Sequence, residues 1–121
     1  MNEDGNSVQM DGANDIGGSS SGFSPMQMLL AAVGGCSAID IILILKKQKQ
    51  NIESFEVEVE GEREKIEDYS LFRNICLHFK LKGKLEKEKV ERAVKLSLEK
   101  YCSVSKTLEP TAKITYKVSI N

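Results

Sequence analysis

The stretch SPMQMLLAAVGGCSAIDIILILKK, residues 24 to 47, is the most apolar run of the chain and decides its fold. Ser24, Pro25 and Gln27 are typical of a helix start, with a capping serine, a proline at the first helical position and a glutamine that completes a capping box. This start predicts a helix from Pro25 towards Gln50. Because nearly every position from Leu29 to Leu45 is small or apolar, we expect the helix to be buried on all sides, as the central element of the fold.

The same run raises the alternative of a membrane span. Residues 28 to 45 contain only Ser37 and Asp40 as polar side chains, and two lysines follow directly. An aspartate in mid-membrane is costly, however, and two glycines interrupt the run. The acidic residues upstream also argue against a signal peptide, which begins with basic residues. We therefore expect a buried helix at the centre of a soluble dimer, with no membrane partner.

Length and composition describe a single soluble domain spanning residues 1–121. The chain is long enough for one core, and its formal net charge of −1 gives no electrostatic footprint for nucleic acid. Its three cysteines, Cys36, Cys76 and Cys102, are odd in number and far apart, which is typical of the reducing cytoplasm. No Cys-x-x-Cys spacing is present and His78 is the only histidine, so we expect neither a metal site nor a cofactor.

Three stretches alternate between apolar and polar residues, the pattern of strands with one buried face. They cover residues 53–62, 71–81 and 113–120, and glutamates on the first oppose lysines on the second. Residues 8–10 are expected to form a short strand, and residues 12–23 a loop. Cys76 and His78 share the wet face of the second stretch, so we expect them to have a surface role and not to form a catalytic pair.

A second, amphipathic helix is expected from Glu86 to Tyr101. One stripe along it carries Val90, Ala93, Val94, Ser97, Leu98 and Tyr101. The segment SVSKTLEP, residues 103–110, is expected to be a turn. The order strand, helix, strand, strand, helix, strand predicts an α+β domain, in which an antiparallel sheet packs on the long central helix and on this second helix.

The glycine pair before Cys36 has two interpretations. If Gly34 and Gly35 break the helix, Cys36 lies in the first turn of its second half, where free backbone N–H groups stabilise a thiolate that can attack a peroxide or a disulfide. Alternatively, the glycines let another helix pack closely, and Cys36 is a small buried apolar residue. Cys102 could act as a resolving thiol, although nothing in the sequence places it beside Cys36.

Three motifs resemble the OsmC/Ohr family from Ser24 to the C-terminus. They are SPMQMLLAAVGGCSAIDIILILKKQKQ, FEVEVEGER and VERAVKLSLEKYCSVSKTL. The resemblance implies an OsmC-like fold and an intertwined homodimer, with helices in the middle, sheets outside and two active sites at the interface. It also implies reduction of organic hydroperoxides in oxidative-stress defence. In that reaction Cys36 is the peroxidatic cysteine, Cys102 is the resolving cysteine, and an external dithiol recycles the disulfide.

The chain departs from the family pattern at the residues that activate the cysteine. Peroxidase members carry a glutamate directly after the proline of the helix start, paired with an arginine from the N-terminal region, whereas this chain has Met26 and no arginine before Arg63. The family's first strand also has no counterpart. Gln27 is the nearest polar substitute, but its place in the capping box explains it better. We expect Met26, Gln27 and Tyr101 to border the substrate.

Other apolar side chains could line the same substrate pocket, although such residues are more often part of a core. They are Phe23, Met28 and Phe72. Asp40 follows Cys36 by one helical turn, and a buried carboxylate needs a partner. A hydrogen bond at a dimer interface or at a helix cap is the favoured explanation, and a role in positioning the thiol is the alternative.

Two functions follow from these residues. The first is a cytoplasmic, homodimeric, thiol-dependent peroxidase that reduces a small hydrophobic hydroperoxide through Cys36 and Cys102. The second is a non-catalytic dimer of the same fold that binds a small apolar ligand, an alternative motivated by Met26 and by the missing first strand.

Overall fold

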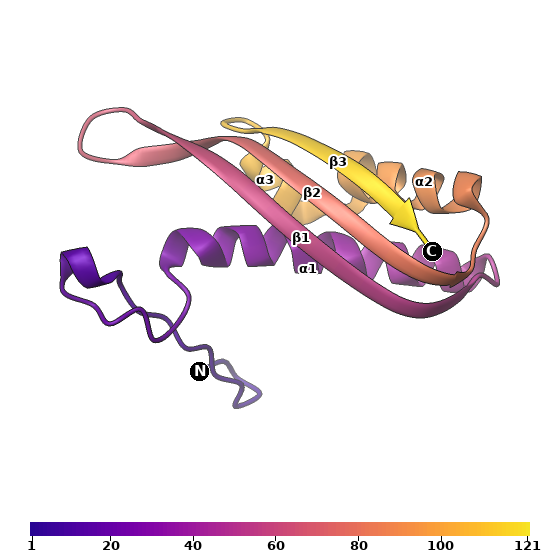
Figure 1. Cartoon of the computed structure of the whole chain (residues 1–121), viewed down its shortest axis with the longest axis horizontal. Coiled ribbons are helices and arrows are strands. Elements are labelled where there is room, and N and C mark those ends of the chain that lie inside the picture. The colour runs from indigo at the N-terminus through magenta and orange to yellow at the C-terminus, as the bar shows by residue number, and fades with distance from the viewer.

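The computed structural model describes all 121 residues, and Figure 1 shows its long hairpin and its helices. Its elements are helix α1 (Pro25–Lys47), strands β1 (Asn51–Lys65) and β2 (Ser70–Lys84), helix α2 (Lys87–Leu96), π-helix η2 (Ser97–Tyr101), helix α3 (Ser103–Leu108) and strand β3 (Lys113–Ile120). The core lies between the helices and the inner face of β2. It contains Val33, Ile41, Leu45, Ile75, Leu77, Phe79, Leu81, Val90, Ala93 and Val94.

The sheet is mixed, with strand order β1-β2-β3. β1 and β2 pair antiparallel as expected, with Glu58 opposite His78, whereas β3 pairs parallel with β2. The prediction of a wholly antiparallel sheet is therefore wrong. The reason is that the chain leaves the end of β2 through α2, η2 and α3 before it returns, and such a helical crossover joins strands that run in the same direction.

Helix α1 begins as predicted and continues without a break. The Ser24 hydroxyl accepts a hydrogen bond from the Gln27 N–H at 3.2 Å, and Gln27 Oε1 accepts one from the Ser24 N–H at 2.8 Å. The helix runs through Gly34 and Gly35 to Lys47, so the expected break is absent and Cys36 lies in mid-helix. There the backbone N–H groups serve the helix itself, and the dipole of a helix start cannot stabilise a Cys36 thiolate.

The two glycines are not equivalent. A Cβ on Gly34 would approach Val59 Cγ2 to 2.9 Å, whereas a Cβ on Gly35 would meet nothing within 4 Å. Gly34 therefore lets strand β1 lie close against α1. The close-packing interpretation of the pair is correct for Gly34, although the element that approaches is a strand and not a helix.

Only one face of α1 is covered within the chain. Val33, Ile41 and Leu45 are fully buried, whereas Ile39 is 63% exposed and Leu43 54%. By length and composition α1 could cross a membrane, a test that core helices of soluble proteins also pass. The expectation of burial on all sides is not met within one chain, because the elements that contact α1, namely β1, α2, η2 and α3, leave Ile39 and Leu43 exposed.

Three local predictions need correction. The predicted second helix ends as an α-helix at Leu96 and continues as the π-helix η2. The predicted turn after it is helix α3, since Cys102 caps that helix by accepting the Ser105 N–H on its sulfur. The predicted N-terminal strand is a single bridge between Met10 and Phe23, and the 12–23 loop includes one short 3-10 turn.

The wet face of the hairpin is as predicted. Glu58 and Lys80 form an ion pair at 2.6 Å across the two strands. Cys76 and His78 both lie on this face, half-buried, and His78 Nε2 is 2.7 Å from the Ser119 hydroxyl. These contacts agree with a surface role for both residues.

Candidate functional site

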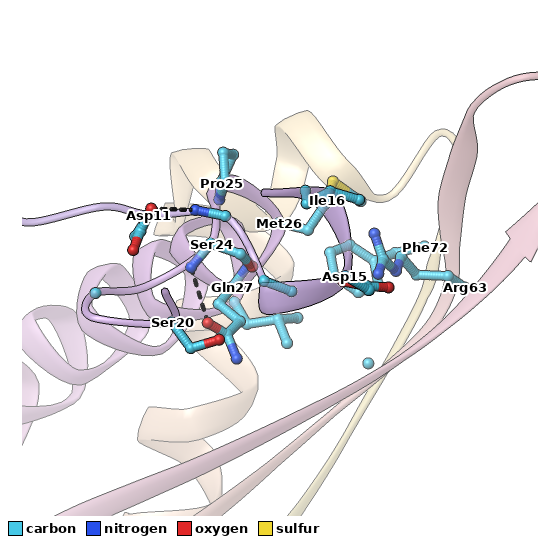
Figure 2. A pocket seen from close by; sticks show the side chains of 15 residues that line it. Asp11, Asp15, Ile16, Ser20, Ser24, Pro25, Met26, Gln27, Arg63 and Phe72 are labelled. Atoms are coloured by element: carbon cyan, nitrogen blue, oxygen red, sulfur yellow. Dashed lines mark hydrogen bonds between the residues drawn. The ribbon is translucent and has the colours of Figure 1, made fainter. Parts of the chain in front are cut away.

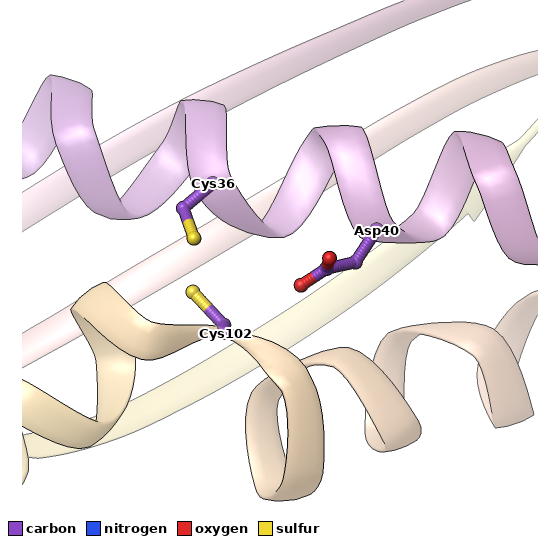
Figure 3. A group of neighbouring side chains, drawn as sticks. All are labelled: Cys36, Asp40 and Cys102. Atoms are coloured by element: carbon purple, nitrogen blue, oxygen red, sulfur yellow. The ribbon is translucent and has the colours of Figure 1, made fainter.

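Three side chains that could do chemistry meet between α1 and the start of α3. Figure 3 shows Cys36 and Asp40 pointing from α1 towards Cys102. The two sulfurs and a carboxylate oxygen of Asp40 all lie within 4.8 Å of one another. Cys36 and Asp40 are four residues apart, so both project from the same face of the helix. The structure therefore brings the two predicted catalytic cysteines together and adds a carboxylate.

The π-helix η2 positions Cys102. The Cys102 N–H donates to the Ser97 carbonyl, five residues earlier, at 2.6 Å, and this wider turn ends the helix at the cysteine. The Cys102 sulfur then accepts the Ser105 N–H at 3.4 Å and caps α3, with its side chain fully buried. Single π-helical turns inside helices often occur at functional sites.

Asp40 has a partner within the same chain. The buried Ser97 hydroxyl lies 3.1 Å from Asp40 Oδ2, to which it can donate, and 3.3 Å from the Ser37 carbonyl oxygen. Within the chain Asp40 therefore has a serine hydroxyl as its partner, and the favoured explanation of a hydrogen bond at a dimer interface or a helix cap stays a prediction. Ser97 was missed as a site residue. The sequence feature that could have indicated it is its hydroxyl side chain on the otherwise largely apolar stripe of the second helix.

The surroundings of Cys102 keep it protonated at neutral pH. Burial, the largest influence, raises the pKa of the Cys102 thiol to about 11, and Cys36 and Asp40 act in the same direction, while the Ser105 N–H opposes them. None of these influences is a cationic side chain. The arginine and glutamate that would favour a thiolate in the family's peroxidases have no counterpart beside these sulfurs.

The residues expected to border the substrate lie in two different places. Met26 and Gln27 line a cavity of about 750 Å³ at the start of α1, together with Arg63 and Phe72 (Figure 2). Tyr101 is not part of that cavity; it lies beside Cys102, 52% exposed. Met26 precedes Cys36 by ten residues, which is about 15 Å along a straight helix. Within one chain, Met26 and Gln27 therefore do not reach the sulfurs.

The other residues predicted to line the substrate pocket do not all lie at this cavity either. Phe72 lines the cavity with Met26, but neither Phe23 nor Met28 does. The lining is mixed, since Asp11, Asp15 and Arg63 stand beside the apolar residues. The cavity is thus less apolar than the sequence led us to expect.

Comparison with known proteins places the chain in a family. Residues 17–117 match the model of the OsmC-like proteins, and the chain belongs to this family. Protein YhfA of Escherichia coli K12 is 47% identical over 98 residues, which are 80% of this chain and 72% of YhfA. The resemblance stated from the sequence motifs is confirmed.

Solved structures share the fold. A hypothetical protein from Aquifex aeolicus VF5 has a TM-score of 0.74 and 35% identity, over 84% of this chain and 78% of that one. An organic hydroperoxide resistance protein OsmC from Legionella pneumophila has a TM-score of 0.73 and 19% identity, over 93% of this chain and 80% of that one. The α+β architecture is therefore that of OsmC-like structures.

Proposed function

We propose that this protein is a thiol-dependent peroxidase that reduces organic hydroperoxides through Cys36 and Cys102. The observation that carries the proposal is the approach of the two sulfurs to within 4.8 Å, although Cys36 lies in the middle of α1 and Cys102 lies 66 residues later, between η2 and α3. At that separation a disulfide can close by side-chain rotation and a small backbone adjustment. The OsmC protein of Legionella pneumophila, whose name records hydroperoxide resistance, has the same fold and lends support.

The reaction would proceed in three balanced steps. The Cys36 thiolate attacks the terminal peroxide oxygen, the O–O bond breaks, and the alkoxide takes up a proton and leaves as an alcohol. The resulting Cys36 sulfenic acid is attacked by Cys102, so that an S–S bond forms and water leaves. An external dithiol then supplies two electrons and two protons to restore both thiols.

Accessibility supports this assignment of roles. Cys36 is half-buried and Cys102 is fully buried, so a peroxide meets Cys36 first. The high pKa of Cys102 keeps it protonated, and because the thiolate is the reactive form, Cys102 is the less suitable of the two to attack a peroxide. A peroxidatic cysteine must be accessible to the peroxide, whereas a resolving cysteine only has to lie close to the peroxidatic sulfur.

The proposal includes a cytoplasmic homodimer. The uncovered side chains of α1, among them Ile39 and Leu43, form a surface that a second copy would bury. Because Met26 and Gln27 lie far from Cys36 on the same helix, they can border a substrate at Cys36 only from the other subunit. Tyr101 would border it from the subunit that carries Cys102.

An alternative function is a non-catalytic dimer that binds a small apolar ligand. It is favoured by Met26, which stands where peroxidases carry a glutamate, and by the apolar part of the mixed cavity, which Met26 lines with Leu30 and Phe72. In that case the two cysteines would be structural.

Peroxide titration of the reduced protein distinguishes the two functions. We expect cumene hydroperoxide to produce one Cys36–Cys102 disulfide per chain, detected by mass spectrometry of the digested protein. Cys36→Ser removes the product, whereas Cys76→Ser, the matched control on the outer face of the sheet, leaves it unchanged. Free thiols that survive excess peroxide would instead support the ligand-binding protein.

A further inference from the structure

The cluster of Cys36, Asp40 and Cys102 gathers three acidic groups and no cation. Asp40 takes part in none of the five ion pairs of the chain, and its hydrogen-bond partner is the neutral Ser97 hydroxyl. The two sulfurs and a carboxylate oxygen of Asp40 lie within 4.8 Å of one another, so one cation could contact all three. Cysteine binds a metal ion as the thiolate, so a cation bound here would take the place of the thiol protons.

The donor set is one that thiophilic divalent cations prefer. Zinc is bound by cysteine sulfur at about 2.3 Å and by carboxylate oxygen at about 2.0–2.2 Å, so its tetrahedral ligands lie roughly 3.5–3.8 Å apart. The three donor atoms here lie no more than 4.8 Å apart. To bind the cation, the donor atoms would have to approach one another by no more than about 1.0–1.3 Å.

Neighbouring groups already orient the donors. Ser97 donates to Asp40 Oδ2, and the Ser105 N–H donates to the Cys102 sulfur, as outer-shell groups do around metal ligands. Cys36 and Asp40 are half-buried, which leaves a route from solvent. Three protein ligands leave one position of a tetrahedron open.

From this geometry we propose that Cys36, Asp40 and Cys102 bind a divalent cation of the zinc class, one per chain. The site uses both sulfurs, so a bound cation and a Cys36–Cys102 disulfide exclude each other. Binding itself does not depend on the peroxidase function. Cys102 is far in the sequence from Cys36 and Asp40 and no metal-binding spacing motif is present, which is why the sequence led us to expect no metal.

Cobalt is the probe that tests the proposal. Reduced full-length protein, freed of thiol reagents, is titrated with Co²⁺ under nitrogen. We expect a thiolate-to-cobalt charge-transfer band that saturates at one equivalent per chain and disappears when one equivalent of Zn²⁺ is added. A folded, reduced protein without this band would overturn the proposal.

Variants identify the ligands. Cys36→Ser and Cys102→Ser should each weaken or abolish the band, and Asp40→Asn should lower the affinity at least tenfold. Ser97→Ala, which removes only the orienting hydrogen bond, should lower it about 10- to 100-fold. Cys76→Ser is the matched control and should bind as the unmodified protein does. A band unchanged in Cys36→Ser and Cys102→Ser would place the cobalt elsewhere and contradict the site.

The peroxide assay separates this inference from the proposed function. Metal-free protein that forms the disulfide but shows no cobalt band would retain the peroxidase and refute the metal site. Protein that binds cobalt but forms no disulfide with peroxide would support the metal site and contradict the peroxidase.

Discussion

At the scale of single residues, Gly34 is the position where the smallest change has a structural cost. Its Cα faces strand β1, and an added methyl group would approach Val59 Cγ2 to 2.9 Å. Contacts that short force the surroundings to move, and such overpacking costs about 1–3 kcal/mol. Gly35, its neighbour, has open space at the same place.

The two glycines therefore make a matched pair of variants. We expect Gly34→Ala to be less stable than Gly35→Ala by about 1–3 kcal/mol, since both gain the same helix propensity and only the first meets the strand. Chemical denaturation at one fixed protein concentration measures the difference. Equal stability of the two variants would mean that β1 does not approach α1 so closely.

Ser97 supports a second residue-scale prediction. Ser97→Ala leaves Asp40 without its hydroxyl partner, so we expect a loss of about 1–3 kcal/mol in the free energy of unfolding. Ser103→Ala, on an exposed serine of the neighbouring helix α3, serves as the control and should change stability little. Thermal and denaturant unfolding of both variants tests the contact.

At the scale of elements, an ion pair between Glu58 and Lys80 links strands β1 and β2 across the wet face of the hairpin. The Lys80 ammonium, hydrogen-bonded to Glu58, holds the pKa of Glu58 below its usual value. A carboxyl whose pKa is lowered by folding stabilises the protein above its unfolded pKa, and this contribution disappears as the pH falls through the folded pKa.

The lowered pKa of Glu58 therefore predicts how the contribution of this ion pair to stability changes with pH. The stability difference between the protein and Glu58→Gln should be greatest near neutral pH and should vanish in acid, as Glu58 becomes protonated. Because the pair is exposed, we expect a small effect. Glu60→Gln, on the same wet face but outside every ion pair of the chain, should show no such pH dependence. Denaturation midpoints between pH 7 and pH 3 provide the measurement.

The elements also show what a sequence can and cannot reveal. The start of α1 and the alternation of β1, β2 and β3 were predictable, because capping and alternation act over a few neighbouring residues. The direction of β3 was predicted wrongly as antiparallel, although a helical crossover such as the predicted second helix joins strands that run in the same direction. The i, i+4 relation of Cys36 to Asp40 followed from the sequence, but the position of Cys102 depended on a crossover and a π-helix that leave no local pattern.

At the scale of the whole molecule, the uncovered face of α1 is the surface on which the proposed dimer depends. Ile39 and Leu43 are large apolar side chains in solvent, and their exposure in one chain is costly. A second copy of the chain would remove that cost. The proposed dimer therefore follows from surface that the fold leaves bare.

We expect the protein to have twice its chain mass in solution, and Ile39→Glu combined with Leu43→Glu to yield a monomer. Neither side chain belongs to the buried core, so the fold should survive the change. Val8→Glu, on an equally exposed apolar residue of the N-terminal segment, should leave the dimer intact. Light scattering after size exclusion gives the masses. A double variant that keeps the dimer mass would show that this face is not the interface.

The π-helix η2 makes the site depend on chain length as well as on residue identity. Its wide turn contains one residue more than an α-helical turn, and each residue of an α-helix advances by about 100°. Deleting the exposed Glu99 would tighten the turn and swing Cys102 away from Cys36, although both thiols and Asp40 would still be present. An insertion or deletion in η2 would thus abolish the proposed chemistry even though Cys36, Asp40 and Cys102 are all unchanged.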